Sequence, residues 1–164
     1  MSFKNKNTSL ILFCGLPGSG KTTLAKELEK ERQAIRLCPD EWKTDLGLDF
    51  FDEESCLKVE ASLWKLAKTL LNLGQDVILE NGFWPRVERA ELRDKAKALN
   101  VEIEIHYLDV PFKELMRRIE IRNASGDIYT VPLSEKHMQG YAKLFQAPDE
   151  SELALYTRAI THKG

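Results

Sequence analysis

Short apolar runs alternate along the chain with stretches in which apolar residues recur at helical spacing. Residues 10–14 form a continuous apolar run that leads into glycines, which is typical of a buried central strand. Comparable runs predict further strands at residues 34–37 and 76–80. Strands separated by helical stretches are the pattern of an α/β domain with a parallel sheet.

Helical spacing predicts the elements between these strands and after them. Gly74 is a suitable stop for a long helix, and Ser134 is a suitable N-cap for a later one. Asp109 is placed to cap a helix that begins near Phe112. With the helix that begins near Phe112, the predicted helices cover residues 21–32, 54–73, 85–100 and 134–145. Residues 40–53 are acidic and loop-like, and the polar stretch 124–131 is a loop or a lid.

Two segments depart from this simple pattern. Apolar and polar residues alternate over residues 101–107, which predicts a strand with one wetter face. We therefore expect this strand away from the centre of the sheet or under thin cover. Residues 153–160 fit a short last strand or the end of a helix, and β-branched residues near their end favour the strand.

Composition and charge narrow the class of protein. The 164 residues suit one domain spanning 1–164, and 24 Lys+Arg against 26 Asp+Glu give a net charge of −2. A dedicated duplex-DNA binder would be expected to have a basic excess, although a local basic groove stays possible. The three cysteines, Cys14, Cys38 and Cys56, form no CxxC, which favours reduced thiols in a cytoplasmic protein.

The start of the chain allows a competing interpretation as a secretory signal. Lys4 and Lys6 precede the apolar residues 10–13, as a charged segment precedes the apolar one in such signals. The run is too short, and it leads into a glycine loop instead of a small-residue cleavage site. No stretch approaches the ~20 apolar residues that a membrane span requires.

The decisive motif is Gly15–Thr22, which fits G-x-x-x-x-G-K-[ST] in full. It follows a predicted buried strand and opens a predicted helix, the context that a phosphate-binding loop requires. Its glycines let backbone N–H groups converge on a phosphate, and Lys21 should bridge the β- and γ-phosphates of ATP. The hydroxyl of Thr22 should hold Mg²⁺. The expected nucleotide-binding residues are Gly15, Pro17, Gly18, Ser19, Gly20, Lys21, Thr22 and Thr23.

Two acidic residues follow predicted strands at the carboxyl edge of the sheet, where α/β proteins bind ligands. Asp40 could accept the proton of an acceptor hydroxyl, although Pro39-Asp40 is also common turn chemistry. Glu80 ends an apolar strand as the Mg²⁺-binding acid of such sites does, but it is longer than the commoner Asp.

Basic residues supply further candidates. Arg118 and Arg122 lie four apart on one predicted helix face and would repel each other unless an anion such as a triphosphate lies between them. The alternative is a solvated face on which they pair with Glu114 and Glu120. Arg86 could hold a phosphate or a substrate, and Trp84 is the tryptophan best placed to touch a ligand.

Together, the segments 15–23, 80–86 and 118–123 with Asp40 resemble the P-loop kinases of the zeta-toxin, polynucleotide-kinase and chloramphenicol-phosphotransferase type. The chain is most similar to small bacterial "predicted kinases" labelled as AAA-family ATP-binding proteins, over residues 8–161. The resemblance implies a three-layer P-loop NTPase fold with a five-stranded parallel sheet of nucleoside-kinase topology and a lid near 118–133.

The resemblance also implies site roles. Asp40 resembles the base that activates the acceptor, Arg118 and Arg122 resemble lid arginines, and Arg86 or Arg89 lies where related kinases hold the acceptor. The function expected is therefore an ATP- and Mg²⁺-dependent transfer of phosphate to a hydroxyl of a small-molecule or nucleotide-like acceptor. The alternatives are a kinase of nucleic-acid 5′ ends, which the charge disfavours, and a non-catalytic module gated by nucleotide.

Overall fold

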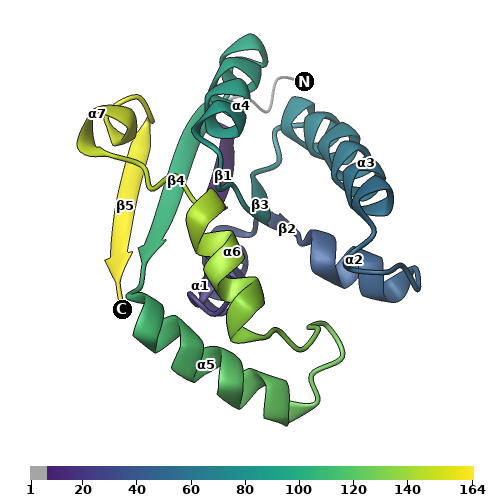
Figure 1. Cartoon of the computed structure of the whole chain (residues 1–164). Coiled ribbons are helices and arrows are strands. Elements are labelled where there is room, and N and C mark those ends of the chain that lie inside the picture. Colours follow the sequence, from purple (N-terminus) through teal and green to yellow (C-terminus); the bar gives the residue numbers. More distant parts are fainter. Residues whose placement is uncertain (1–6) are drawn as a thin grey trace.

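The computed structural model describes residues 7–164 (Figure 1). Lys4 and Lys6, and with them the expectation about a secretory signal, lie outside the described residues. Within residues 7–164, no helix combines the length and apolar character that crossing a bilayer requires.

Five parallel strands form the sheet in the described part of the chain, in the order β2-β3-β1-β4-β5. The strands are β1 (Ser9–Cys14), β2 (Ile35–Leu37), β3 (Val77–Gly82), β4 (Glu102–Asp109) and β5 (Arg158–Lys163). The apolar strand β1 is central and fully buried, as its continuous hydrophobic run predicts. The α/β class and the five-stranded parallel sheet are confirmed.

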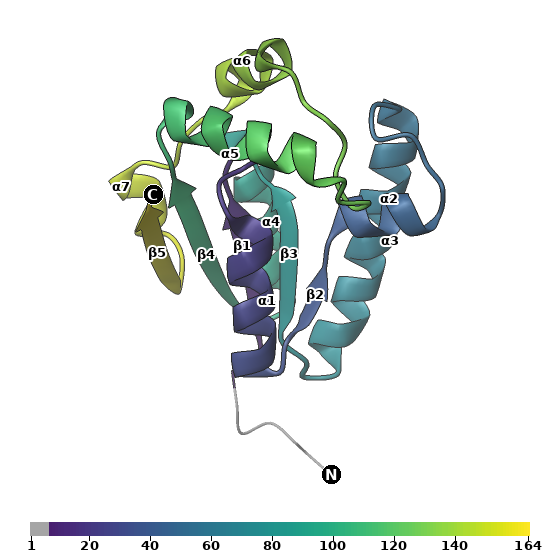
Figure 2. The same ribbon diagram turned by 90° about the horizontal axis from the view of Figure 1, so that it is seen from below.

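Helices cover both faces of the sheet. They are α1 (Lys21–Arg32), α2 (Pro39–Asp45), α3 (Glu53–Asn72), α4 (Arg86–Ala98), α5 (Phe112–Ser125), α6 (Glu135–Leu144) and α7 (Glu150–Leu153). Figure 2 shows α1 in front of the sheet, with α3 and α4 behind it. Because successive side chains of β1 point to opposite faces, Leu10 and Leu12 pack with the α3–α4 layer while Ile11 and Phe13 pack with α1.

The helices α5 and α6 lie beyond the carboxyl ends of the strands (Figure 2). Their apolar residues form a separate cluster with Leu16, which includes the buried residues Leu115, Ile119 and Met138. This cluster places the segment between α5 and α6 over the edge of the sheet at which the glycine loop lies.

Residues 40–53 were expected to form a loop, and the structure corrects this because α2 occupies Pro39–Asp45. Pro39 stands at the start of the helix, where its missing N–H is no loss. Asp40 and Glu41 lie in the first turn, where negative charge favours a helix. The acidic composition that suggested a loop therefore marks a helix start.

Asp109 does not cap α5, contrary to expectation, because it is the last residue of β4 and Pro111 occupies the N-cap position without a side-chain bond. The Asp109 carboxylate instead accepts a hydrogen bond from Tyr107 and pairs with Lys163. Ser134 does cap α6, since its side chain accepts the backbone N–H of His137.

The strand β4 lies next to the edge of the sheet, as its alternating pattern indicates, but its polar residues Glu104 and His106 are buried. His106 contacts Glu104 at 2.7 Å and His162 of β5 at 2.9 Å. Arg32 of α1 donates to the other oxygen of Glu104 at 2.6 Å. The polar face is therefore a buried network between α1 and β5, which corrects the expectation of a wetter face.

Candidate active site

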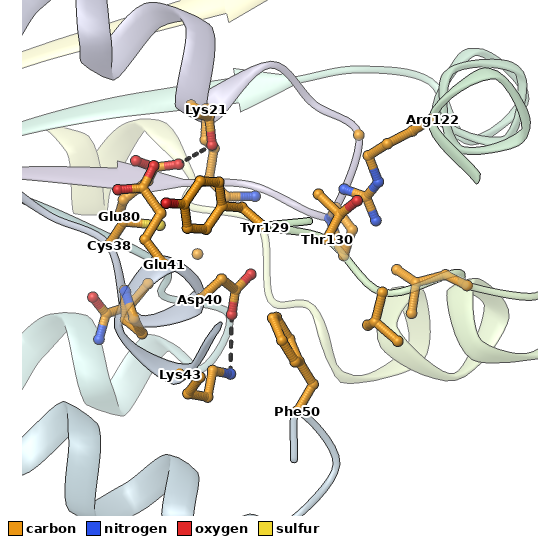
Figure 3. A pocket seen from close by; sticks show the side chains of 18 of the residues that line it. Lys21, Cys38, Asp40, Glu41, Lys43, Phe50, Glu80, Arg122, Tyr129 and Thr130 are labelled. Atoms are coloured by element: carbon orange, nitrogen blue, oxygen red, sulfur yellow. Dashed lines mark hydrogen bonds and ion pairs between the residues drawn. The ribbon is translucent and has the colours of Figure 1, made fainter. Parts of the chain in front are cut away.

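A cavity of about 660 Å³ opens at the carboxyl edge of the sheet (Figure 3). It is lined by the glycine loop, by α2, by the end of β3, by α5 and by residues 127–131 of the segment that follows α5. This is the edge at which ligands of open parallel sheets bind. The cavity gathers most of the residues that the sequence singled out, from segments far apart in the chain.

The glycine loop joins the buried strand β1 to the first turn of α1. Gly18 and Gly20 have φ of +82° and +96°, a backbone region that side chains disfavour. A Cβ on Gly15 would lie 2.7 Å from Oγ of Ser19, so a side chain here would force Ser19 to shift. The loop can therefore curl as a phosphate cradle does.

Lys21 folds back onto this loop. Its Nζ donates to the carbonyls of Gly15 and Leu16, both at 2.9 Å. Burial lowers the pKa of Lys21 to about 8, although the charges of Glu80 and Asp40 act in the opposite direction. Among the described residues, Oγ of buried Ser19 has no hydrogen-bond partner. The loop thus presents a desolvated cation to the cavity and keeps an unpartnered hydroxyl buried beneath it.

Thr22 and Glu80 face each other across the floor of the cavity. The Thr22 hydroxyl donates to Oε1 of Glu80, and Nη1 of Arg36 donates to Oε2 at 2.8 Å. Within residues 7–164, no group of three or more His, Cys, Asp or Glu residues could hold a metal by itself. Mg²⁺ commonly takes one or two protein oxygens and completes its shell with phosphates and water. The oxygens of Thr22 and Glu80 fit such a site.

Asp40 projects from the first turn of α2 into the cavity, as Figure 3 shows. Its Oδ1 lies 2.9 Å from Nζ of Lys43, and its side chain is 57% exposed. Lys43 is itself nearly buried and lies over the ring of Phe50 at 4.9 Å. Asp40 therefore stays accessible to a ligand while one neighbouring cation supports its charge.

The two lid arginines both line the cavity, but they differ in their partners. Arg118 donates to Glu114 at 2.8 Å, as the alternative interpretation expected, and also reaches the carbonyls of Gly18 and Ser19 at 3.4 Å. The buried Nε of Arg122 has no partner among the described residues. Burial lowers the pKa of Arg122, against the effect of Asp40.

Arg89 does not line the cavity, which corrects its assignment to the acceptor. It is fully buried, and it bonds Glu152 at 2.6 Å and the carbonyls of Phe83 and Gln146 at 2.8 and 2.7 Å. Arg86 also lies off the cavity and donates to Asp149 at 2.9 Å. The acidic partners, Asp149 and Glu152, each lie 63 positions further along the chain, so the sequence offered no local indication of these ion pairs.

Trp84 does line the cavity, as expected. Its Nε1 donates to the carbonyl of Gly15 at 3.1 Å, and its ring packs against Tyr141 of α6 with centroids 4.9 Å apart. The segment that follows α5 also closes against α2, because Oγ1 of Thr44 donates to the carbonyl of Ile128 at 3.4 Å. Trp84 therefore lies beside the glycine loop, and the segment that follows α5 brings Tyr129 to the wall that it forms with α2.

Several lining residues were not predicted from the sequence. A charged residue inside the apolar run 34–37 could have revealed Arg36, and an acidic loop with two phenylalanines could have revealed Phe50. Asn81 stands next to Glu80 in β3, and the others gave no local indication because the packing of helices and of the segment after α5 brings them to the cavity. The lining residues missed include Glu41, Lys43, Phe50, Phe51, Glu60, Asn81, Tyr129 and Tyr141, and Arg36 was missed as the partner of Glu80.

Solved structures of other proteins share the fold. A protein from Chloroflexus aurantiacus described as a "putative kinase" is 24% identical, with a TM-score of 0.74 over 97% of this chain and 86% of that chain. Chaetomium thermophilum Kti12, in complex with ADP-AlF3, is 16% identical, with a TM-score of 0.72 over 94% and 88%. The Mycobacterium tuberculosis APS kinase CysC, in complex with AMPPNP and APS, is 20% identical, with a TM-score of 0.63 over 94% and 88%.

No curated protein sequence matches the chain. A family model described as an AAA domain matches residues 10–148, which include the whole glycine loop and all the arginines discussed above. With its P-loop between β1 and α1 and its strand order β2-β3-β1-β4-β5, the chain belongs to this AAA domain family and has the fold of the P-loop kinases.

Proposed function

We propose that the protein is a kinase that transfers the γ-phosphate of ATP to a hydroxyl of a small-molecule acceptor, with Mg²⁺. The observation that carries this proposal is a single cavity in which Asp40 lies with the P-loop residues Lys21 and Thr22. A nucleotide site alone would not require an accessible carboxylate on the opposite wall, whereas a transfer to a hydroxyl does.

Each residue then has a role in an in-line transfer. The P-loop N–H groups and Lys21 bind the β- and γ-phosphates, and Arg118 and Arg122 offset the charge that develops on the moving phosphoryl group. Asp40 accepts the proton of the acceptor hydroxyl. The acceptor oxygen forms a bond to the γ-phosphorus, the bond from that phosphorus to the β–γ bridging oxygen breaks, and ADP leaves.

Thr22 and Glu80 are the residues that would hold Mg²⁺. The ion would neutralise phosphate charge in the bound nucleotide.

The reduced thiols of Cys14, Cys38 and Cys56 form no disulfide and suit a reaction in the cytoplasm. Two features support a kinase in particular: the AAA domain match over residues 10–148, and structural neighbours such as the APS kinase complexed with AMPPNP and APS.

The test compares Asp40→Asn with Asp94→Asn, an exposed aspartate on α4 that serves as the control. Calorimetry measures nucleotide binding, and labelled ATP measures transfer to a broad panel of hydroxyl compounds. We expect Asp40→Asn to retain nucleotide binding and to lose transfer by ~100-fold or more, as removal of a general base does. Equal transfer by wild type and Asp40→Asn would contradict the role of Asp40.

The non-catalytic alternative gives a different result in the same assay. A module gated by nucleotide would bind ATP and hydrolyse it slowly, and no member of the panel would increase ADP release. Phosphorylation of a nucleic-acid 5′ hydroxyl, measured on short oligonucleotides in parallel, would instead identify the end-kinase alternative.

A further inference from the structure

The part of the cavity around Asp40, lined by Lys43, Phe50, Glu60, Asn81 and Tyr141, is where the substrate that receives the phosphate would bind, and it is called the acceptor region below. Its unpartnered polar atoms are mainly oxygens that accept hydrogen bonds. Asn81 lines the cavity, and its buried Oδ1 has no partner within residues 7–164. Glu60 of α3 also lines the cavity, half-buried, and its carboxylate forms no hydrogen bond or ion pair with the described residues. A ligand that satisfies these two groups must bring donors with it.

Lys43, the lysine of this region, is already engaged. It lies 2.9 Å from Asp40, 3.6 Å from the sulfur of Cys56 and 4.9 Å from the centre of the Phe50 ring. A phosphate or carboxylate on the acceptor would therefore compete with Asp40 for this cation. Figure 3 shows Lys43 beside Asp40 and Phe50, while Arg122 enters from α5 on another side of the cavity.

The cationic groups that remain belong to the nucleotide side. Lys21 binds carbonyls of the P-loop itself, and Arg118 reaches the carbonyls of Gly18 and Ser19. Arg122 stands on α5 together with Arg118, and its Nε has no partner among the described residues. The transferring phosphate of ATP is the partner that suits this Nε. Lys26 lines the cavity as well, but it is exposed on α1 in the turn that follows Thr23, so it also lies on the nucleotide side. A negative charge on the acceptor would therefore have to share Lys43 with Asp40.

Carboxylates dominate the acceptor region. Burial raises the pKa of Glu60, and the charge of Asp40 raises it further against the effect of Lys43. Burial and the charge of Glu60 likewise raise the pKa of Glu88 on the neighbouring helix α4. Neither carboxylate forms an ion pair with a described residue, and a positive ligand would relieve the cost of a half-buried charge.

Aromatic rings complete the region. Phe50, Phe51, Tyr129 and Tyr141 line the cavity with Trp84. Burial and the nearby charge of Asp40 raise the pKa of Tyr141, which therefore lies close to the proposed base. Aromatic faces attract ammonium groups, and they also pack against the C–H faces of sugars and polyols.

Resting on the kinase function proposed above, we infer that the acceptor is a hydroxyl compound that carries an amine, an amino sugar or amino alcohol whose ammonium group binds Glu60 and Asn81 among the aromatic rings. The ammonium group supplies several donors and a positive charge, which are what this region lacks. A phosphorylated or nucleic-acid acceptor would bring further negative charge to a wall of carboxylates.

The test uses compounds that share a carbon skeleton and differ in the charged group that they carry. Calorimetry measures binding of 2-amino-2-deoxyglucose, glucose and glucose 6-phosphate, together with matched amino, neutral and phosphorylated polyols, to protein saturated with Mg²⁺ and a non-hydrolysable ATP analogue. We expect the amines to bind at least ~10-fold more tightly than their neutral partners, as charge-assisted hydrogen bonds do. Tighter binding of a phosphorylated or neutral member, or no binding by any amine, would overturn the inference.

Glu60→Gln removes the charge, and Glu54→Gln on the same helix is its matched control because Glu54 is 76% exposed and pairs with the exposed Lys58. We expect Glu60→Gln to lose the preference for amines and Glu54→Gln to keep it, while a melting curve confirms that each variant folds. An unchanged preference in folded Glu60→Gln would also overturn the inference.

The same samples separate this inference from the proposed function. Phosphate transfer from labelled ATP is measured for every compound that binds. Amines that bind but receive no phosphate would contradict the kinase and leave the ligand class standing. Transfer to neutral or phosphorylated acceptors alone would support the kinase and reject the amine.

Discussion

Arg36 of β2 holds Glu80 of β3 in a nearly buried ion pair, with Nη1 at 2.8 Å from Oε2. The same guanidinium donates from Nη2 to both oxygens of Glu41, at 2.7 and 2.8 Å. One arginine therefore joins the acid that faces Thr22 to the first turn of α2, which carries Asp40. The side chain of Arg36 therefore fixes Glu80, a proposed Mg²⁺ ligand, relative to the helix that carries Asp40, the proposed base.

Arg36→Met should destabilise the fold. The substitution leaves Glu80 buried without its cation, and breaking a buried pair in this way typically costs ~3–5 kcal/mol. Urea denaturation at pH 7 measures the loss. Arg36→Lys should recover part of the stability but not the two-pronged contact with Glu41. A Met variant as stable as wild type would show that the pair does not hold the site together.

Lys21→Met should weaken nucleotide binding by ~100-fold, the order expected when a charged group loses its hydrogen bonds to phosphate. Titration calorimetry with the ATP analogue and Mg²⁺ gives the dissociation constants. Lys30→Met, an exposed lysine at the far end of the same helix, is the control and should bind as wild type does. If the two variants bound equally well, Lys21 would have no part in holding the nucleotide.

Glu152→Gln should be far more damaging than Glu54→Gln. The Arg89–Glu152 pair is fully buried, with both side chains 0% exposed, whereas Lys58 and Glu54 are 75% and 76% exposed. Leaving Arg89 unpaired typically costs ~3–5 kcal/mol, and an exposed helix pair contributes ~0.3–0.5 kcal/mol. Chemical denaturation measures the free energy of unfolding that each variant loses, and equal losses would refute the structural role assigned to Arg89.

Glu104 should make the fold sensitive to acid. Burial acts to raise the pKa of Glu104, but the hydrogen bonds from His106 and Arg32 outweigh it and hold that pKa at about 2. A carboxyl group whose pKa is lower in the folded state stabilises the protein above its unfolded pKa, near 4.5. This stability is lost as the pH falls from about 4.5 towards 2.

Melting temperatures of wild type and Glu104→Gln, measured from pH 7 to pH 2, test this dependence. The difference between them should be constant above about pH 5 and should shrink below the unfolded pKa. Glu31→Gln, an exposed residue of α1, is the control and should follow wild type throughout. A difference between wild type and Glu104→Gln that does not change with pH would contradict the network.

Local sequence was sufficient where the chemistry depends on neighbours in the chain. The P-loop is one such case, because its glycines, Lys21 and Thr22 all lie within eight residues between a strand and a helix. The apolar run of β1 likewise predicted a central strand, since burial on both faces requires continuous hydrophobic residues. The position of Asp40 left a turn as the alternative, so its role as a base came from the resemblance to P-loop kinases, and it stays a prediction.

Local sequence misled where a residue has a distant partner. Arg89 was assigned to the acceptor because related kinases hold the acceptor in that region, yet Glu152, 63 positions away, pairs with it in the interior. Glu104 and His106 looked solvated because their strand alternates, yet Arg32 and His162 cover them. A polar residue alone does not reveal whether water or a buried partner satisfies it.

The sequence by itself determined the α/β class, the order of most elements and the phosphate-binding loop, because these follow from periodicity and from spacing within a few residues. Tertiary structure alone decided that Arg36 joins Glu80 to α2 and that Glu60, Asn81 and Tyr141 share a cavity with Asp40. The reason is physical: packing of helices against the sheet sets which distant charges meet, and burial sets which of them still need a partner.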